Sequence, residues 1–199
     1  MAKFDCDIDN ETGWLSGARR CPSPNADTRP PGVAPELIVV HGISLPPGQF
    51  GGPWIDRLFR NELPEGVHPA LTALRSLRVS AHLLIRRDGA CTQYVPLHRR
   101  AWHAGVSTFA HRTGCNDFSV GIELEGTDAA PYEPVQYRVL ARVCLALQRR
   151  WPAISRDRIV GHSDIAPGRK SDPGEAFEWS RLMRELDSLT SETGHARPQ

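Results

Sequence analysis

The sequence predicts one α/β domain, in which buried β-strands pack against amphipathic helices. Residues 36–41 read ELIVVH, a continuous apolar run typical of a strand that is buried on both faces. Residues 118–126 alternate apolar side chains with polar or small ones, which is the period of a strand. Residues 134–151 and 175–189 instead repeat their apolar side chains at helical spacing. With 199 residues and 40% hydrophobic composition, we expect residues 1–199 to form a single domain with a full core.

The two ends of the chain lack such periods. Residues 14–35 contain five prolines and are expected to form an extended segment that lies over the domain. Residues 190–199 are polar and are expected to be disordered.

Shorter elements are expected in the first half of the domain. A short helix is predicted near residues 55–60, and a second at 68–76, where Pro69 stands near the first helical position. Asp88 and Gly89 separate two β-rich runs, which is a strong hairpin signal.

Charge and cysteine content exclude several classes of partner. The 24 basic and 23 acidic residues give a net charge of +1, so composition favours neither nucleic acid nor an anionic membrane as a partner. The five cysteines are irregularly spaced and include no CxxC pair, which favours reduced thiols. Neither an apolar signal peptide nor a membrane span of about 20 apolar residues is visible. We therefore expect a cytoplasmic protein.

The segment 161–174, GHSDIAPGRKSDPG, is rich in polar residues, prolines and glycines. The strand-like sequence IVGH leads into it, and we expect an irregular loop to follow. Loops on the edge of a rigid scaffold concentrate binding and catalytic residues. His162, Lys170 and Asp172 are therefore candidates for one functional centre, whereas Asp164 is expected to stabilise the turn or to orient a ligand.

Two further candidates lie on the predicted strands. His41 ends the first strand and precedes a Gly/Pro-rich loop of the kind that rims a pocket. Glu123 shares a strand face with Gly121, and a glycine inside a strand often marks the close approach of another group. A hydrogen-bonded histidine and a solvent-facing strand would produce the same two patterns. The glycine favours a cleft face with a functional carboxylate.

Two histidines, one carboxylate and an open fourth position are the ligand set of a catalytic Zn²⁺. His41, His162 and Asp172 supply that set. A zinc ion so held activates water for attack on a carbonyl. Glu123 is then placed to carry a proton from the water to the leaving amine, and Lys170 to stabilise the oxyanion. The residues together predict zinc-dependent hydrolysis of an amide or an ester.

Several blocks of the chain resemble a known family. They are VVHGISLPPGQFGGPW, VSAHLLIRRDG, RAWHAGVS, CNDFSVGIELEGTD and GHSDIAPGRKSDPG, and they are similar to blocks of the cytoplasmic N-acetylmuramoyl-L-alanine amidases of the amidase-2 family, in the same order. The resemblance covers roughly residues 15–188. It implies the fold of that family, which peptidoglycan recognition proteins share: a central mixed β-sheet flanked by helices, with zinc on one face.

The resemblance also implies a reaction and a set of residues. The family's zinc ligands fall on His41, His162 and Asp172, its catalytic acid on Glu123 and its lysine on Lys170. The reaction implied is cleavage of the amide between 1,6-anhydro-N-acetylmuramic acid and L-alanine in peptidoglycan recycling. The expected partner is a small muropeptide, and the protein is expected to be a monomer.

Substrate contacts are less well marked in the sequence. Trp102 and His103 form an aromatic and polar cluster suited to a sugar or a peptide, and Arg112 and Asn116 are two further candidates. One departure from the family is Gly42, which follows the first proposed ligand where a polar asparagine is expected. The missing side chain would remove one contact to the substrate.

Three alternative functions fit the residues less well. A peptidoglycan-binding module without activity would typically have lost a zinc ligand, and all three stand in the sequence. An amidase that lyses intact peptidoglycan would be expected to carry an export signal, a lysis partner or a wall-binding domain. A metal-free hydrolase using Cys91 or Cys115 with His103 has no supporting motif.

Overall fold

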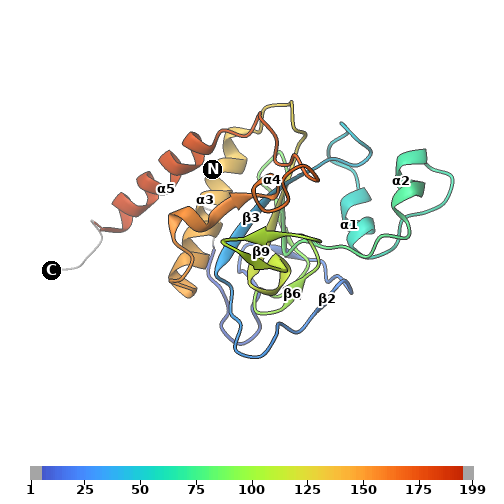
Figure 1. Cartoon of the computed structure of the whole chain (residues 1–199). Helices are drawn as coiled ribbons and strands as arrows, with labels where there is room; N and C mark the ends of the chain where they lie inside the picture. Colours follow the sequence, from blue (N-terminus) through green and yellow to red (C-terminus); the bar gives the residue numbers. More distant parts are fainter. Residues whose placement is uncertain (1–5, 195–199) are drawn as a thin grey trace.

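The computed structural model describes residues 6–194, and a six-stranded sheet runs through its centre (Figure 1). The spatial order is β1 (Arg19–Arg20), β5 (Cys91–Gln93), β4 (Leu83–Ile85), β9 (Ser119–Glu125), β3 (Leu37–Ile43) and β10 (Ile159–Gly161). Within this sheet the β4–β5 hairpin is antiparallel, and the other neighbouring pairs are parallel. The expected central mixed sheet is thus confirmed.

Strands β3 and β9 lie side by side at the middle of the sheet, where both of the apolar runs in the sequence are buried. All of β9 is buried, as are the first five residues of β3. In their parallel register His41 stands opposite Glu123, and Val39 stands opposite Gly121. Side chains at paired positions point to the same face of a sheet. The two polar candidates on the strands are therefore neighbours on one face.

The opposite face of the sheet packs against two long helices. Helix α3 (Pro134–Arg150) and helix α5 (Trp179–Gly194) lie beside each other (Figure 1), and their apolar side chains form one core with those of β3, β4 and β9. The helix expected over 134–151 is confirmed, and it begins with a capping box between Glu133 and Gln136. Because two helices close this face, the polar site must lie on the other one.

Helix α5 is shifted along the chain from the predicted range of 175–189. It starts at Trp179 because residues just before it are tied elsewhere: the amide of Ala176 donates to the carbonyl of Asp128 at 2.9 Å. The helix then continues to Gly194, so residues 190–194 are helical where disorder was expected. Residues 195–199 lie outside the described residues.

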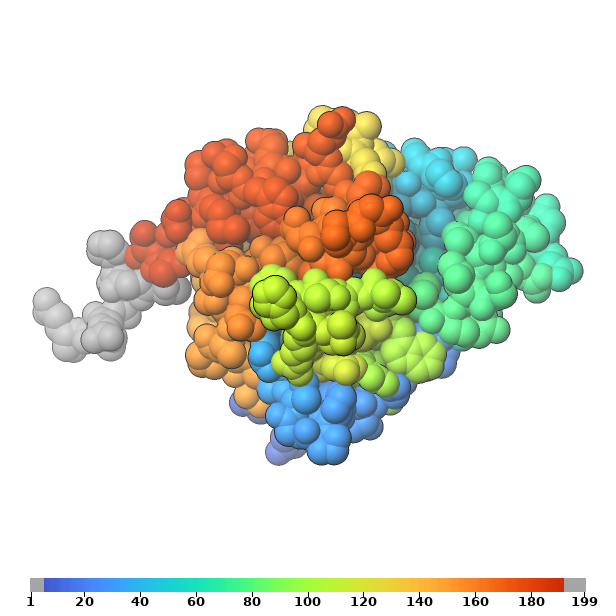
Figure 2. Space-filling view, in the orientation of Figure 1, coloured from blue at the N-terminus to red at the C-terminus, as the bar shows by residue number. Residues whose placement is uncertain are grey.

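Short elements surround the polar face. Helices α1 (Trp54–Phe59) and α2 (Pro69–Leu74) lie at one end of the molecule, far from α5 (Figures 1 and 2). Both match predicted helices, and α2 begins at Pro69 with His68 as its N-cap. The remaining elements are β6 (Arg100–Ala101), β7 (Thr108–Phe109), β8 (Arg112–Thr113), and the 3₁₀ helices η1 (Cys115–Asp117) and η2 (Arg156–Arg158). Within the described residues, none of the helices has the length and apolar character needed to cross a membrane.

Two segments are more regular than the sequence indicated. Residues 14–35 do not only lie over the domain, because they contribute β1 to the edge of the sheet and β2 (Ala26–Asp27) as a partner for β6. The loop 161–174 begins with a single helical turn, α4 (His162–Ile165). Asp164 stabilises this turn, because its Oδ2 accepts a hydrogen bond from the amide of Gly161 at 2.7 Å. The role expected for Asp164 is confirmed.

Candidate metal centre

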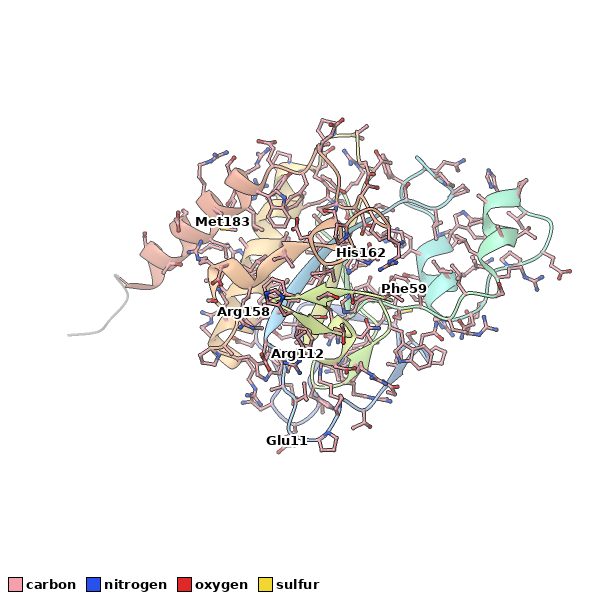
Figure 3. The ribbon with its side chains drawn as sticks, in the orientation of Figure 1. Glu11, Phe59, Arg112, Arg158, His162 and Met183 are labelled. Carbon is pink, nitrogen blue, oxygen red and sulfur yellow. The ribbon has the colours of Figure 1, made fainter. Side chains whose placement is uncertain are left out.

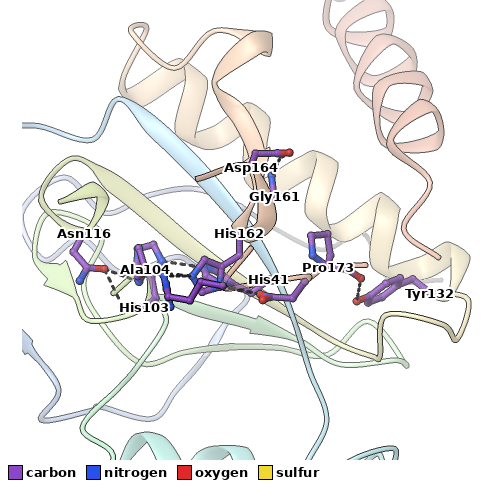
Figure 4. A network of polar contacts seen from close by, with 11 residues as sticks. His41, His103, Ala104, Asn116, Tyr132, Gly161, His162, Asp164 and Pro173 are labelled. Carbon is purple, nitrogen blue, oxygen red and sulfur yellow. Dashed lines mark hydrogen bonds and ion pairs between the residues drawn. The ribbon is translucent and has the colours of Figure 1, made fainter. Parts of the chain in front are cut away.

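Three side chains from distant parts of the chain converge on one point, and two of them, His41 and His162, are labelled in Figure 4. The Nδ1 atoms of His41 and His162 lie 3.0 Å apart, and the Oδ2 of Asp172 lies 3.1 Å from the first and 3.0 Å from the second. His41 comes from β3, His162 from the start of α4, and Asp172 from the loop after α4. The two histidines are buried and Asp172 is partly buried.

The geometry of this triangle fits a tetrahedral metal ion. Ligand atoms about 2.0–2.1 Å from a zinc ion lie roughly 3.3 Å from one another in a tetrahedron. The three observed separations of 3.0–3.1 Å are close to that value. Three protein ligands leave a fourth position open, which is the arrangement of a catalytic metal site rather than a structural one.

The outer nitrogen of each histidine has a partner that orients the ring. The Nε2 of His162 lies 3.2 Å from the carbonyl oxygen of Ala104, to which it can only donate. The Nε2 of His41 lies 2.9 Å from Nδ1 of His103. When Nε2 carries the hydrogen, Nδ1 keeps a free lone pair for a metal. Burial lowers the pKa of His41 to about 4, which keeps its ring neutral at physiological pH.

Asp172 is held in its loop by backbone contacts. Its carbonyl accepts from the amide of Ser163 at 3.0 Å, and the carbonyl of the following Pro173 accepts from the hydroxyl of Tyr132 at 2.8 Å. Burial alone would raise the pKa of Asp172, but the close contacts of its carboxylate with the imidazoles of His162 and His41 outweigh burial and hold that pKa well below its usual range. The carboxylate is therefore ionised, as a metal ligand must be.

Glu123 lies beside the triangle without a partner of its own. It is 9% exposed, and its Oε2 is buried with no hydrogen bond. Burial raises the pKa of Glu123 well above its ordinary value, and the charge of Asp172 adds to the shift, whereas Lys170 opposes it. A buried carboxyl group with a raised pKa next to an ionised one is a typical acid and base arrangement.

A cavity of about 250 Å³ opens beside these groups. Its polar side is formed by the candidate residues Glu123, His162, Lys170 and Asp172. Its apolar side comes from helices α1 and α2 and the turns around them, through Leu58, Phe59, Leu74, Leu77 and Val79. Phe59 and His162, from the two sides of this cavity, are labelled in Figure 3. The cavity can therefore hold a molecule with one polar and one apolar part.

The four candidate substrate contacts lie in different places. Trp102 and His103 line the cavity. Asn116 lies outside its lining, and its Oδ1 accepts from the amides of His103 and Ala104 at 3.0 and 2.8 Å. Arg112 also lies outside the lining; its guanidinium stacks 4.0 Å from the ring centre of Phe118 and pairs with Glu36 at 3.2 Å. Trp102 and His103 are therefore placed to contact a molecule in the cavity, whereas Asn116 stabilises the backbone at residues 103 and 104.

Gly42 has a structural explanation that the sequence did not reveal. A Cβ atom at this position would overlap the hydroxyl oxygen of Tyr132. That hydroxyl is the group that donates to Pro173 next to Asp172. The space that a larger residue would fill is thus occupied by a tyrosine that stabilises the ligand loop. Sequence reasoning missed Tyr132, whose traces in the sequence are Gly42 and Gly126, because a Cβ atom at either glycine would overlap its side chain.

Comparisons with known proteins place the chain among amidases. The amidase-2 family model, described as N-acetylmuramoyl-L-alanine amidase, matches residues 31–175. The 1,6-anhydro-N-acetylmuramyl-L-alanine amidase AmpD of Escherichia coli is 58% identical over 172 residues, which are 86% of this chain and 93% of that protein. A crystal structure of an AmpD derivative has a TM-score of 0.87 at 55% identity, and the match covers 90% of this chain and 98% of that one.

A second solved structure is similar at lower identity. It is the Escherichia coli amidase AmiD in complex with anhydro-N-acetylmuramic acid-L-Ala-D-γ-Glu-L-Lys. It has a TM-score of 0.55 at 26% identity, and the match covers 96% of this chain and 73% of that one. The mixed sheet with its flanking helices is thus the architecture of known amidases.

Proposed function

Because this chain belongs to the N-acetylmuramoyl-L-alanine amidase family, we propose that it hydrolyses the amide between 1,6-anhydro-N-acetylmuramic acid and L-alanine of muropeptides during peptidoglycan recycling. One observation of the site carries this proposal: the triangle of His41, His162 and Asp172 adjoins a cavity that also contains the unpartnered carboxyl group of Glu123. Relatives named for this reaction share more than half of their residues with the chain.

His41, His162 and Asp172 are the proposed ligands of a zinc ion. Their donor atoms are two imidazole nitrogens and one carboxylate oxygen, which zinc accepts. A zinc ion bound there supplies Lewis acidity, which activates water and polarises the scissile carbonyl group. The outer hydrogen bonds of both histidines hold the rings so that Nδ1 faces this centre.

Glu123 is the proposed carrier of the proton. As the water oxygen bonds to the carbonyl carbon, Glu123 takes a proton from the water. It then passes the proton to the alanine nitrogen as the C–N bond breaks, so the products are a carboxylic acid and a free amine. The raised pKa of Glu123 suits both steps, because a carboxyl group with an ordinary pKa would return the proton poorly at neutral pH.

Lys170 and the apolar wall complete the proposed site. Lys170 is exposed at the cavity, where its charge can stabilise the negative carbonyl oxygen in the transition state. Trp102 and the side chains of α1 and α2 offer an apolar surface for the sugar ring. A small muropeptide is the proposed partner, and a monomer in the cytoplasm the proposed setting. The net charge of +1 supports a partner other than nucleic acid or an anionic membrane.

The test is mass spectrometry of the products formed by the zinc-loaded protein from anhydromuropeptide and from intact murein, in parallel. We expect a free stem peptide and the anhydro sugar from the first substrate. Cleavage of murein alone would contradict the recycling function and favour a lytic amidase. Binding of either substrate without cleavage would indicate a recognition module. A Glu123→Gln variant, run beside the wild type, controls for contaminating amidases.

A further inference from the structure

His103 contacts the metal centre without belonging to it (Figure 4). Its Nδ1 lies 2.9 Å from the Nε2 of His41, which is the nitrogen that faces away from the other two ligand atoms. The two rings meet edge to face at a centroid distance of 5.0 Å and an angle of 89°. His103 therefore acts on His41 from behind, and it cannot be a fourth ligand in this position.

The hydrogen bonds beyond His103 have only one possible direction. The hydroxyl of Ser119 lies 2.5 Å from the carbonyl oxygen of Cys115, and a carbonyl can only accept, so the hydroxyl donates to it. Having donated its one hydrogen, the Ser119 oxygen accepts from the Nε2 of His103 at 3.1 Å.

This direction continues inward to the metal centre. A neutral imidazole whose Nε2 donates has an Nδ1 that accepts, so the Nδ1 of His103 accepts from the Nε2 of His41. The Nδ1 of His41 is then the nitrogen without hydrogen. It faces Nδ1 of His162 and Oδ2 of Asp172. A backbone carbonyl thus selects the tautomer of a proposed ligand through two intervening side chains.

Strand β9 provides the place for His103. A Cβ atom at Gly121 would overlap the imidazole ring of His103, so this ring occupies the space above the glycine. Asn116 fixes the backbone on the other side, through the two hydrogen bonds to the amides of His103 and Ala104. Alternate residues of β9 thus supply the hydroxyl of Ser119 that links His103 to the Cys115 carbonyl, the space above Gly121, and the carboxyl group of Glu123. Such close fitting is expected of a residue that positions another.

We propose that His103 is a positioning residue that fixes the tautomer of His41 and thereby strengthens zinc binding, an inference that rests on the proposed function. Both ring nitrogens of His103 are engaged, so the substrate can meet only its carbon atoms. Its contribution reaches the reaction through His41. Residues that orient metal ligands in this way typically contribute 10–100-fold to metal affinity.

Two substitutions of similar size separate orientation from packing. His103→Gln can accept from His41 with its oxygen and donate to Ser119 with its nitrogen, so it preserves the direction of the chain. His103→Leu fills similar space but can do neither. In competition with a chelator, we expect the leucine variant to bind zinc roughly 10–100-fold more weakly than wild type. The glutamine variant should stay within a few-fold of wild type.

A second measurement needs no metal and no activity. Two-bond ¹H–¹⁵N correlation spectra of the metal-free protein report which nitrogen of His41 carries the hydrogen. We expect hydrogen on Nε2 in wild type and in His103→Gln, and a mixture of tautomers in His103→Leu. Ser119→Ala leaves the imidazole in place but removes its acceptor, so it should also give a mixture. This variant keeps the test open if His103→Leu does not fold.

Two results would overturn the proposal. One is an unchanged His41 tautomer and unchanged zinc affinity in His103→Leu. The other is an equal loss in the leucine and glutamine variants, which would assign His103 a packing role. If the wild type itself binds no zinc, the proposed function fails, and the tautomer of His41 in the metal-free protein still decides the role of His103.

Discussion

Two carboxyl groups face the same centre, and the chain surrounds them in opposite ways. Glu123 projects from the middle of the sheet, with a buried oxygen that has no partner and a raised pKa. Asp172 projects from a loop, where its Oδ2 lies 3.1 Å from the Nδ1 of His41 and 3.0 Å from the Nδ1 of His162, and it has a lowered pKa. The same chemical group is therefore suited to exchange a proton in one place and to bind a cation in the other.

The site also divides into two halves according to the element that carries each side chain, the central sheet or the loop 161–174. His41 and Glu123 form the sheet half, where the ladder between β3 and β9 fixes the backbone. His162, Lys170 and Asp172 form the loop half, within residues 161–174, where hydrogen bonds inside the loop and one from Tyr132 hold the backbone in place. We expect changes at His162 and Asp172 to act on metal binding, and a change at Glu123 to act on proton transfer.

The largest effect is expected for Asp172→Ala. It removes the one anionic group among the proposed ligands and leaves two histidines, so zinc affinity should fall by more than the roughly 100-fold typical of an outer residue. Metal analysis after dialysis would measure this, with circular dichroism to confirm the fold. Full zinc stoichiometry in the variant would refute the assignment of Asp172 as a ligand.

Glu123→Gln should separate proton transfer from metal binding most clearly. The variant keeps the size of the side chain but cannot carry a proton, so kcat should fall roughly 10²–10⁴-fold. Zinc stoichiometry should match that of the wild type, because Glu123 is not among the three converging donors. A loss of zinc together with activity would instead make Glu123 part of the metal site.

Lys170→Ala is expected to reduce kcat by about 100-fold, the loss typical of removing one oxyanion-stabilising group. Zinc content should stay unchanged, although Lys170 lies in the loop half, because its side chain contributes no donor to the triangle. Steady-state kinetics with Lys170→Arg as the charge-preserving control tests this. An unchanged kcat in Lys170→Ala would exclude the role.

The two carboxyl groups should also affect stability with opposite dependence on pH in the metal-free protein. The folded-state pKa of Glu123 lies above its usual value of 4.5. The contribution of Glu123 to the free energy of unfolding is therefore fully present below pH 4.5 and is lost as pH rises through the raised pKa. Asp172 has a folded-state pKa below its usual value of 3.8, so its carboxylate stabilises the fold above pH 3.8, and this stabilisation is lost as pH falls through the lowered pKa.

Glu123→Gln removes the pH dependence of stability that comes from the Glu123 carboxyl group. The metal-free variant should be more stable than wild type at pH 8, by about 1–3 kcal/mol, because an unpartnered buried carboxylate is no longer formed. This advantage should shrink toward pH 4. Urea unfolding at both pH values measures it, and an advantage that does not change with pH would contradict the raised pKa.

The smallest effect is expected for Tyr132→Phe, which removes the hydrogen bond to Pro173 beside Asp172. The loss of this bond should cost about 1 kcal/mol of stability and weaken zinc binding several-fold. Tyr137→Phe is the matched control, because the hydroxyl of this buried tyrosine accepts from the amide of Glu178, just before α5. It should lower stability by a similar amount without changing zinc affinity.

Much of the fold was predictable because its signals are local. The apolar run 36–41 and the alternation over 118–126 each report burial of the residues that carry them, and both are central strands. The helix from Pro134 likewise follows from its apolar repeat. The start of α5 was not predictable, because a hydrogen bond to Asp128 delays it and no local pattern records such a contact.

The candidate site divides in the same way. By itself the sequence determined which residue types are available, where strands end, and that Gly121 leaves room for an approaching group. Only the tertiary structure decided that this group is His103, that Tyr132 fills the space beside Gly42, and that Arg112 points elsewhere. Periodicity describes the surroundings of one segment at a time, whereas these contacts depend on the register and packing of segments far apart in the chain.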